Sequence, residues 1–309
     1  MFEQFLNWLK TFFVIATVIV TPTPQDISYS TAEAFTAAPT YLATIAPTPI
    51  NSPDEQIYTF HPTSKPTSRP TPVPLPVNNT APKSGFSKQN VKTEIGNFVV
   101  NLVAADITST KVIVDTASSS DCNSNCPALS LSEYVSRNGG WAGVNGTYFC
   151  PKEYPSCVGK ENSFDLLVMN KDKYYFNSGN NVYSTNPAVV FGSGYVRFVN
   201  SGSQWGRDTG VNGVLMNYPL LVFNNNINFN GDGDPKKGSK GSRSFVANKG
   251  NTIYIGVTQN VTVSENALVM KALGMDNALN LDSGGSTALW HNGYKVGPGR
   301  GIPNAIIFK

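Results

Sequence analysis

The distribution of proline constrains this chain more than any other feature of its sequence. Thirteen of the 21 prolines lie between Thr21 and Ser84, in a stretch made mostly of Thr, Pro, Ser and Ala. Such a composition offers too little apolar surface to offset the entropy lost on ordering. We therefore expect residues 21–87 to be a disordered Thr/Pro-rich linker that provides reach. The remainder, residues 88–309, is long enough for one sizeable core and is the predicted domain.

An apolar run from Thr11 to Val20 follows Lys10, ahead of the linker. It is shorter than the roughly 20 residues that span a bilayer, and one basic residue before an apolar core is typical of a secretory signal. The candidate cleavage site, Ala32-Glu33-Ala34, lies unusually far from the run, so an uncleaved signal anchor is an equal alternative for residues 1–20. We expect an extracytoplasmic domain, secreted or anchored to the outer face of the membrane by this segment alone.

Charge and histidine content exclude several partners and sites. The net charge is +3, and no basic cluster is dense enough to indicate a nucleic acid partner. With only His61 and His291, zinc sites built on several histidines are excluded, and a catalytic triad would depend on His291. Residues 230–234 resemble the start of an EF-hand, but Pro235 and Gly241 replace the required Gly and Glu, which favours a solvated turn. We expect no metal and no cofactor.

Four cysteines fit an exported protein. Cys122 and Cys126 are spaced C-x3-C, and Cys150 and Cys157 are spaced C-x6-C, so the short C-x2-C pairs of an all-cysteine zinc site are missing. Disulfides are the favoured interpretation. Local pairing is the simplest of the three possible connectivities, and the spacing alone does not select one.

Short β-rich segments bounded by Asn, Gly and Ser dominate the predicted domain. We expect strands over residues 98–103, 111–114, 165–169, 173–176, 195–199, 252–257 and 305–308. Capping boxes at Ser130 and Thr262 predict helices that end before Gly139 and Gly274. The sequence therefore predicts an α+β domain whose predominantly β core carries a few packed helices.

A carboxylate follows a short apolar segment near the C-terminus. Residues 278–281 are expected to form a buried strand, and Asp282 comes next, before the loop Ser283-Gly284-Gly285-Ser286-Thr287. A sheet holds such a carboxylate rigidly, and the glycines let a ligand approach the backbone, where successive amides can bind an anion. The alternative is a tight turn in which Asp282 caps its own loop amides. The pattern alone favours neither.

Three further segments place polar residues where chemistry could use them. One apolar segment ends in Asn145-Gly146-Thr147, for which a type I′ hairpin turn is the competing interpretation. Arg243 and Ser244 follow a Lys/Gly/Ser-rich loop, and Arg300 lies with Asn304 near the C-terminus. The planar guanidinium of arginine suits phosphate because it donates two parallel hydrogen bonds. Either arginine alone is more often a surface residue.

In order and combination, these four segments resemble the phosphodiester glycosidase family. The family's Asn-Gly-x-aromatic-Phe block is similar to residues 145–149, and its Arg-Ser/Thr block to Arg243-Ser244. Its Asn-Leu-Asp-Gly-Gly-Gly-Ser block, the most specific of the four, is similar to residues 280–286, and its terminal Arg and Pro-Asn-Ala to residues 300–305. The resemblance covers about residues 97–309. Ser283 departs from the pattern, because the family usually has a glycine there.

The resemblance implies hydrolysis of a sugar-1-phosphodiester, such as that of N-acetylglucosamine, at the glycosidic C–O bond. Asp282 would be the nucleophile or general base at the sugar carbon, Arg243 and Arg300 would bind the phosphate, and Asn145 would contact a sugar hydroxyl or Asp282. The substrate-binding residues would be Gly146, Thr147, Ser244, Ser283, Gly284, Gly285, Ser286, Thr287 and Asn304. Phosphate, with a second pKa of about 6, can leave as an anion without a proton donor.

Two other functions stay open from the residues. A phosphodiesterase acting at phosphorus is disfavoured by the lack of metal-ligand clusters. A non-catalytic module that binds cell-envelope material or exopolysaccharide could use the same Asp and Arg side chains for recognition. If Asp282 only caps its turn, Asp165 and Asp276 are the alternative catalytic carboxylates.

Overall fold

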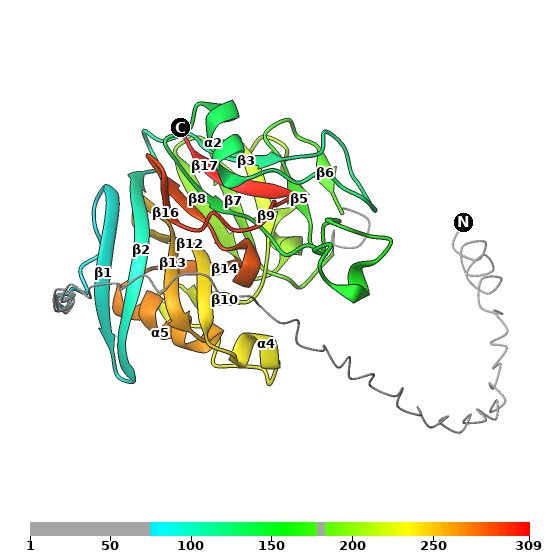
Figure 1. The fold of residues 1–309 in the computed structure, drawn as a ribbon. Coiled ribbons are helices and arrows are strands. Elements are labelled where there is room, and N and C mark those ends of the chain that lie inside the picture. The colour runs from blue at the N-terminus through cyan, green and yellow to red at the C-terminus, as the bar shows by residue number, and fades with distance from the viewer. Residues whose placement is uncertain (1–74, 178–182) are drawn as a thin grey trace, which may run out of the picture. The chain divides into compact units, whose positions relative to one another are not determined.

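The computed structural model describes residues 75–177 and 183–309 (Figure 1). The expected signal segment and most of the expected linker lie outside these residues. Ordered structure begins before the predicted boundary at Lys88, since β1 starts at Gly85 and Val77 forms a β-bridge with Asn90. Within the described ranges, none of the helices combines the length and hydropathy that crossing a membrane requires.

The largest sheet is antiparallel and has seven strands, in the order β1-β2-β13-β12-β14-β10-β11. In that order they span Gly85–Thr93, Gly96–Asp106, Thr252–Val261, Gly241–Lys249, Asn277–Ser283, Leu220–Phe223 and Asn226–Ile227. The ladder between β12 and β14 is irregular near Arg243 and Ser283, which face each other. This irregularity lies beside the strand end that carries Asp282.

Two five-stranded sheets pack beside the large one. The first has the order β16-β15-β4-β17-β3, spanning Tyr294–Val296, Leu289–His291, Ala142–Asn145, Asn304–Phe308 and Val112–Thr116. The second has the order β6-β5-β9-β7-β8, spanning Tyr175–Phe176, Val168–Met169, Gly213–Met216, Ala188–Gly192 and Tyr195–Val199. Strand β4 is central in the first sheet, and its last residue, Asn145, pairs with Ala305 of β17 on one side and donates its amide to the Ala288 oxygen on the other.

Helices are few and mostly short. In the two described ranges, three are α-helical, α2 over Leu131–Asn138, α4 over Pro235–Gly238 and α5 over Val263–Ala272. Three are single 3₁₀ turns, η1 over Pro155–Cys157, η2 over Gly202–Trp205 and η3 over Gly284–Ser286. Both expected capping boxes are formed, at the start of α2 and of α5. Gly139 and Gly274 follow these helices with φ of +60° and +71°, as the sequence predicted.

The hydrophobic core has two layers on either side of the seven-stranded sheet. Helix α5 covers one face, where Ala267, Val269 and Met270 join a buried cluster with side chains of β2, β12 and β13. The opposite face meets both five-stranded sheets in a second cluster, whose fully buried members include Val103, Ile255, Leu279, Val144, Ile306, Val189 and Leu215. This arrangement is the predicted α+β class with a predominantly β core.

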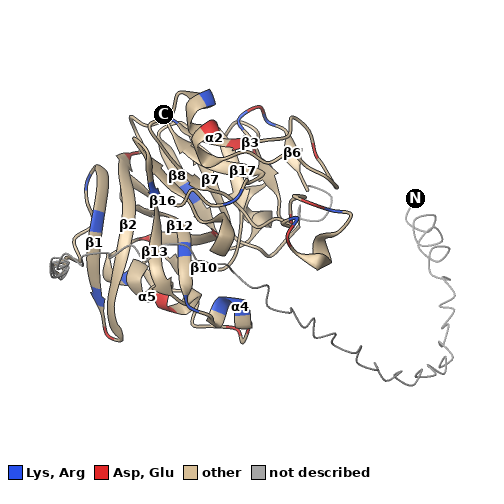
Figure 2. Ribbon diagram, viewed as in Figure 1, with Lys and Arg blue, Asp and Glu red and all other residues tan. Residues whose placement is uncertain are grey.

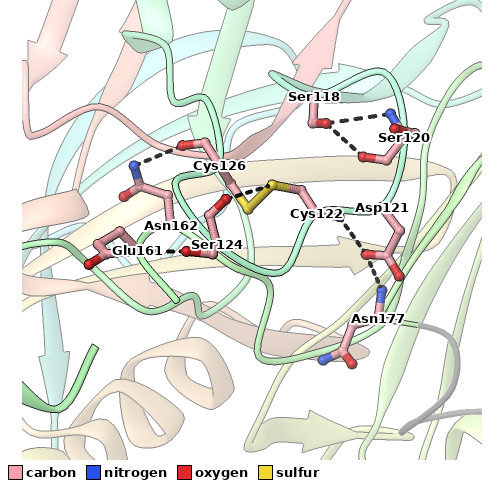
Figure 3. Close-up of a disulfide and its surroundings, with 9 residues drawn as sticks. All are labelled: Ser118, Ser120, Asp121, Cys122, Ser124, Cys126, Glu161, Asn162 and Asn177. Carbon is pink, nitrogen blue, oxygen red and sulfur yellow. Dashed lines mark hydrogen bonds between the residues drawn. A yellow bond between two sulfur atoms is a disulfide. The ribbon is translucent and has the colours of Figure 1, made fainter. Parts of the chain in front are cut away.

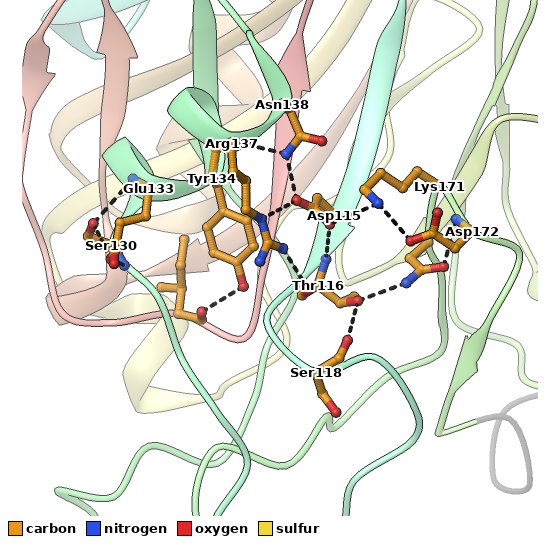
Figure 4. Close-up of polar contacts among 12 residues, drawn as sticks. Asp115, Thr116, Ser118, Ser130, Glu133, Tyr134, Arg137, Asn138, Lys171 and Asp172 are labelled. Atoms are coloured by element: carbon orange, nitrogen blue, oxygen red, sulfur yellow. Dashed lines mark hydrogen bonds and ion pairs between the residues drawn. The ribbon is translucent and has the colours of Figure 1, made fainter.

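A buried carboxylate joins α2 to the end of β3 (Figure 4). The Asp115 side chain is 3% exposed and accepts hydrogen bonds from Arg137 Nε at 2.7 Å, Asn138 Nδ2 at 2.5 Å and the Thr116 amide at 2.9 Å. The Lys171 ammonium lies 4.0 Å away. A buried charge is tolerated only when paired and hydrogen-bonded in this way. The network fixes α2 on the end of β3.

The bounds of the predicted strands agree best with the observed strands where the ladder is long, and the observed strand is shorter than predicted where the ladder has few pairs. Strand β8 has the predicted bounds, whereas the strand expected over residues 165–169 contains ladder pairs only at Val168–Met169. Leu166 and Leu167 are buried without being in a strand, so their apolar character reflects burial and not pairing. The sequence analysis did not predict strands β1, β7, β9, β10, β11, β15 and β16.

Candidate active site

The large sheet and the first five-stranded sheet meet where β14 and β4 end. The Asp282 amide donates to the main-chain oxygen of Gly146 at 3.0 Å, and Asn145 Nδ2 donates to the main-chain oxygen of Asp282 at 2.7 Å. Asn145 Oδ1 accepts from Ser244 Oγ at 2.7 Å and from the Ala288 amide at 3.1 Å. Asn145 is completely buried, so its side chain cannot contact a sugar hydroxyl, which was one of the two predicted roles. It contacts Asp282 instead, and it positions the end of β14 through the main chain of that residue.

The Asn145-Gly146 pair does not form the type I′ turn that was the competing interpretation. Neither residue has the positive φ that this turn requires, and the chain continues past β4 without a hairpin. Glycine is needed at 146 for another reason, because a Cβ there would lie 1.8 Å from Asn304 Oδ1. That oxygen accepts the Thr147 amide at 2.9 Å. The residues after β4 are thus shaped by close packing against β17.

Asp282 has the most perturbed carboxyl group of this region. It is partly exposed, and its Oδ1 accepts the Ser283 amide at 2.8 Å. Burial raises the pKa of Asp282 to about 6, although hydrogen bonds from Ser286 and Ser283 and the positive charge of Arg300 act to lower it. The turn-capping contact is therefore present, but a simple cap would have a lowered pKa. A carboxyl group poised near neutrality is typical of a functional site.

Asp282 opens into a cleft of about 530 Å³. Six of the predicted site residues line it, namely Asp282, Arg243, Arg300, Ser283, Gly284 and Ser286. Seven do not, namely Asn145, Gly146, Thr147, Ser244, Gly285, Thr287 and Asn304. Most of these seven are buried behind the cleft wall and shape it from within.

Arg243 forms part of the cleft wall and is bound mainly by main-chain oxygens. Its Nη2 donates to Lys236 at 2.8 Å and to Ser239 at 2.5 Å, and its Nε donates to Val261 at 3.3 Å. The residue is 8% exposed. Arg243 therefore anchors the segment around α4 and offers the cleft only part of its guanidinium.

Arg300 approaches the cleft from the C-terminal loop. Its Nη1 forms an ion pair with Glu153 at 2.8 Å, and its amide donates to the Gly285 oxygen at 2.8 Å. A Cβ on Gly285 would lie 2.1 Å from Arg300 Nη2, so the absence of a side chain at Gly285 makes room for the guanidinium. This is the physical role of one glycine in the loop after Asp282.

Several cleft residues were not predicted. Tyr148 and Tyr218 lie with ring centroids 5.1 Å apart, and Tyr148 Oη accepts from Asn280 Nδ2 at 2.8 Å. Burial raises the pKa of Tyr148 well above its usual range, so its hydroxyl stays protonated. Asn217, buried beneath them, accepts the Tyr148 amide at 3.0 Å and donates to the Asn280 oxygen at 2.7 Å. The Asn-Tyr-Pro segment at 217–219 carried no recognised pattern that would have indicated this.

Asp165 also lines the cleft, and it was named only as an alternative to Asp282. Burial raises its pKa, and its negative charge raises that of Asp282 in turn. Asp276, the other alternative, is not a lining residue and accepts the Gly250 amide at 2.6 Å. His291 packs against Phe86 and Trp141 and does not line the cleft either.

The EF-hand-like segment forms a turn that leads into α4. Asp234 caps α4 by accepting the Lys236 amide at 2.7 Å, and both Asp232 and Asp234 form ion pairs with Lys237. Among residues 75–177 and 183–309, no group of three or more His, Cys, Asp and Glu side chains has the arrangement of a metal site.

Two disulfides flank this region, and no described cysteine is free. Cys122 pairs with Cys126 in a loop that hydrogen-bonds to Glu161 and Asn162 (Figure 3). Cys150 pairs with Cys157, and both of these residues line the cleft. Each cysteine is therefore paired with its neighbour in the sequence, which is the simplest of the three connectivities. The Cys150–Cys157 disulfide closes a short loop at the cleft mouth.

Comparison with known proteins decides the family. The profile of the phosphodiester glycosidase family matches residues 138–309, more than half of the chain. The chain belongs to the phosphodiester glycosidase family. The match starts later than the expected residue 97, but every residue that lines the cleft lies within it. A comparison with curated protein sequences gives no match.

Two solved structures share the fold of this phosphodiester glycosidase family member. One is the catalytic domain of zebrafish N-acetylglucosamine-1-phosphodiester alpha-N-acetylglucosaminidase, auto-inhibited by its pro-peptide, with a TM-score of 0.56, 13% identity, and coverage of 76% of this chain and 86% of that chain. The other is a hypothetical protein from Synechocystis, with a TM-score of 0.50 and 16% identity. That match covers 72% of this chain but only 61% of the Synechocystis protein.

Proposed function

We propose that this protein is an exported hydrolase that cleaves the glycosidic C–O bond of a sugar-1-phosphodiester. The substrate class is that of an N-acetylglucosamine-1-phosphodiester, and the products are the free sugar and a phosphomonoester. The observation that carries the proposal is a partly buried carboxyl group, Asp282, whose pKa is about 6 and which shares a cleft with Arg243 and Arg300.

The chemistry of the leaving group explains why one such carboxylate is enough. An ordinary glycoside leaves as an alkoxide, so most glycosidases pair a nucleophile or base with a second carboxylic acid that protonates the leaving oxygen. A phosphomonoester, with a second pKa of about 6, leaves as an anion without that proton. Its developing negative charge needs fixed positive charge, which Arg300 and the exposed part of Arg243 would supply.

Asp282 is assigned the role of nucleophile or general base at the sugar carbon. Its position is held by the hydrogen bonds of Asn145 and Gly146 to its main chain, so its carboxyl group enters the cleft in a fixed orientation. Ser283, Gly284 and Ser286 are proposed to bind substrate along the loop that follows. The protonated Tyr148 is a hydroxyl donor on the same wall, suited to a sugar.

The proposal that the protein is exported is supported by its cysteine chemistry. All four cysteines form disulfides in the structure, and disulfides persist in oxidising compartments. We propose that residues 1–20 direct export, as signal or anchor, and that residues 21–87 space the catalytic domain from the cell surface.

Product identification tests the proposal against its alternatives. The full chain would be incubated with a GlcNAc-1-phosphodiester, and the products separated by mass spectrometry. Free sugar together with a phosphomonoester is expected. Sugar-1-phosphate would instead indicate a phosphodiesterase, and binding without turnover would indicate a recognition module. The Asp282→Asn variant should lose turnover, whereas Asp276→Asn, a matched substitution outside the cleft, should retain it.

A further inference from the structure

The ring of Tyr154 contacts two cations at the mouth of the cleft. Lys236 Nζ lies 5.3 Å from the ring centroid, and Arg300 Cζ lies 5.6 Å from it. Tyr154 is 43% exposed and sits in the loop that the Cys150–Cys157 disulfide closes. All three side chains line the same cleft as Asp282. Three segments that are far apart in the sequence therefore meet around one aromatic ring.

Lys236 differs from the other lysines of this segment in its partners. Figure 2 shows basic residues concentrated on α4. Lys237 is paired with Asp232 and Asp234, and Lys240 lies 3.1 Å from Glu265. In the described parts of the chain, the Lys236 ammonium has no carboxylate oxygen within 4.0 Å, so it contacts the Tyr154 ring and acts on the more distant Asp165 only by lowering the pKa of that carboxyl group.

A cation held by an aromatic ring keeps its charge available. A carboxylate partner neutralises a lysine, whereas the quadrupole of a ring attracts the ammonium without adding a net negative charge. The main chain of Lys236 is fixed as well, because its amide donates to Asp234 and its oxygen accepts from Arg243 Nη2 at 2.8 Å. The result is a positive charge that no carboxylate contacts directly, held at the cleft mouth by a rigid base.

We propose that Lys236 and Arg300, placed by the ring of Tyr154, form a clamp that binds the phosphate group of the substrate. The assignment rests on the proposed function, and it adds Lys236 as a phosphate ligand. Arg243, besides the part of its guanidinium that faces the cleft, anchors α4 beneath Lys236. Lysine suits this place because its ammonium has three donors and no acceptor. Tyr154 is a positioning residue that acts through the two cations.

Phosphate binding and sugar binding can be measured separately, which isolates the clamp. The affinity of the full chain for inorganic phosphate and for free N-acetylglucosamine would be determined by calorimetry, in wild type and in Lys236→Met. We expect phosphate affinity to fall about tenfold or more while N-acetylglucosamine affinity is unchanged. Lys152→Met removes an exposed lysine of the neighbouring loop that does not line the cleft, and it should change neither affinity.

The role of the ring is tested by paired substitutions at Tyr154. Tyr154→Phe keeps the aromatic face and should keep phosphate affinity, whereas Tyr154→Leu should weaken it severalfold. With a phosphodiester substrate, Lys236→Met should raise KM and lower kcat/KM. Unchanged phosphate affinity in Lys236→Met, or equal losses for phosphate and sugar, would overturn the clamp. A wild-type protein that binds phosphate but turns over no phosphodiester would contradict the proposed function and leave the clamp supported.

Discussion

At the scale of single residues, the charged form of Asp282 lowers the stability of the folded protein. Its pKa is raised from 3.8 to about 6 in the folded protein because burial disfavours its charge. The folded state therefore keeps a proton that the unfolded chain has lost between these two pH values. The contribution of Asp282 to the free energy of unfolding is present in full below pH 3.8, and it is lost as the pH rises through about 6.

Replacing this carboxyl group with an amide should make the protein more stable where the carboxylate is charged. For Asp282→Asn we expect a gain in the free energy of unfolding of about 1–3 kcal/mol at neutral pH, because the variant has no buried charge. At pH 4 the gain should vanish, since Asp282 is then protonated. Urea denaturation at the two pH values measures both quantities. A gain that did not depend on pH would contradict the raised pKa.

The same carboxyl group predicts the pH dependence of catalysis. If ionised Asp282 acts on the sugar carbon, kcat/KM should fall about tenfold per pH unit below pH 6. No acid is required for the leaving group, so the profile should stay flat from pH 7 to the alkaline side instead of forming a bell. A pH–rate profile with a phosphodiester substrate tests this. A descending alkaline limb would reveal a catalytic acid, for which Asp165 in the same cleft is the first candidate.

Some residue roles could be predicted from sequence and others could not. The local pattern around Asp282, a strand end before a Ser/Gly loop, left two interpretations open, and its similarity to the most specific block of the family made it the predicted catalytic residue. The positioning role of Asn145 depends on contacts with Ser244 and Asp282, roughly a hundred or more residues away, so no local pattern contains it. The lysine clamp was missed for a similar reason, since Lys236 is distinguished only by a ring that a distant loop supplies.

At the scale of elements, the cleft depends on short irregular segments held by strong local constraints. Strands β2 and β13 and the capped helices were predicted because their apolar patterns and capping residues are local, whereas β1, with 9 residues, was not predicted. Helix α4 has only four residues, and the loop of Tyr154 contains only a 3₁₀ turn, so neither has a periodic signal. A disulfide fixes one of these segments and Arg243 fixes the other.

The two disulfides should differ in function although they resemble each other in size. Closing such short loops contributes about 2 kcal/mol each, so Cys150→Ser/Cys157→Ser and Cys122→Ser/Cys126→Ser should lower stability by similar amounts. Only the first pair lines the cleft, so only its loss should raise KM for a phosphodiester, because Tyr154 would no longer be held. Thermal melting and steady-state kinetics on both double variants test this. Equal kinetic effects would show that the 150–157 loop has no special role.

At the scale of the whole molecule, the site lies where two separately built sheets meet. Asp282 comes from the seven-stranded sheet, and Asn145 comes from the neighbouring five-stranded sheet. The α+β class followed from composition and local patterns. The strand order did not, because strands distant in sequence pair beside one another, as β4 does with β15 and β17. The order of the four motifs carried the information on function that the topology could not supply.

The central claim is that water attacks carbon and not phosphorus, and isotope labelling tests it most directly. Free sugar and a phosphomonoester could also arise by cleavage of the P–O bond on the sugar side, so product identity alone does not locate the broken bond. The full chain would hydrolyse a GlcNAc-1-phosphodiester in ¹⁸O-enriched water, and the phosphomonoester would be examined at once by mass spectrometry. Cleavage of the C–O bond leaves the phosphomonoester without ¹⁸O, and this is the result that we predict. One ¹⁸O atom in the phosphomonoester would place the attack at phosphorus and contradict the assignment of Asp282 to the sugar carbon.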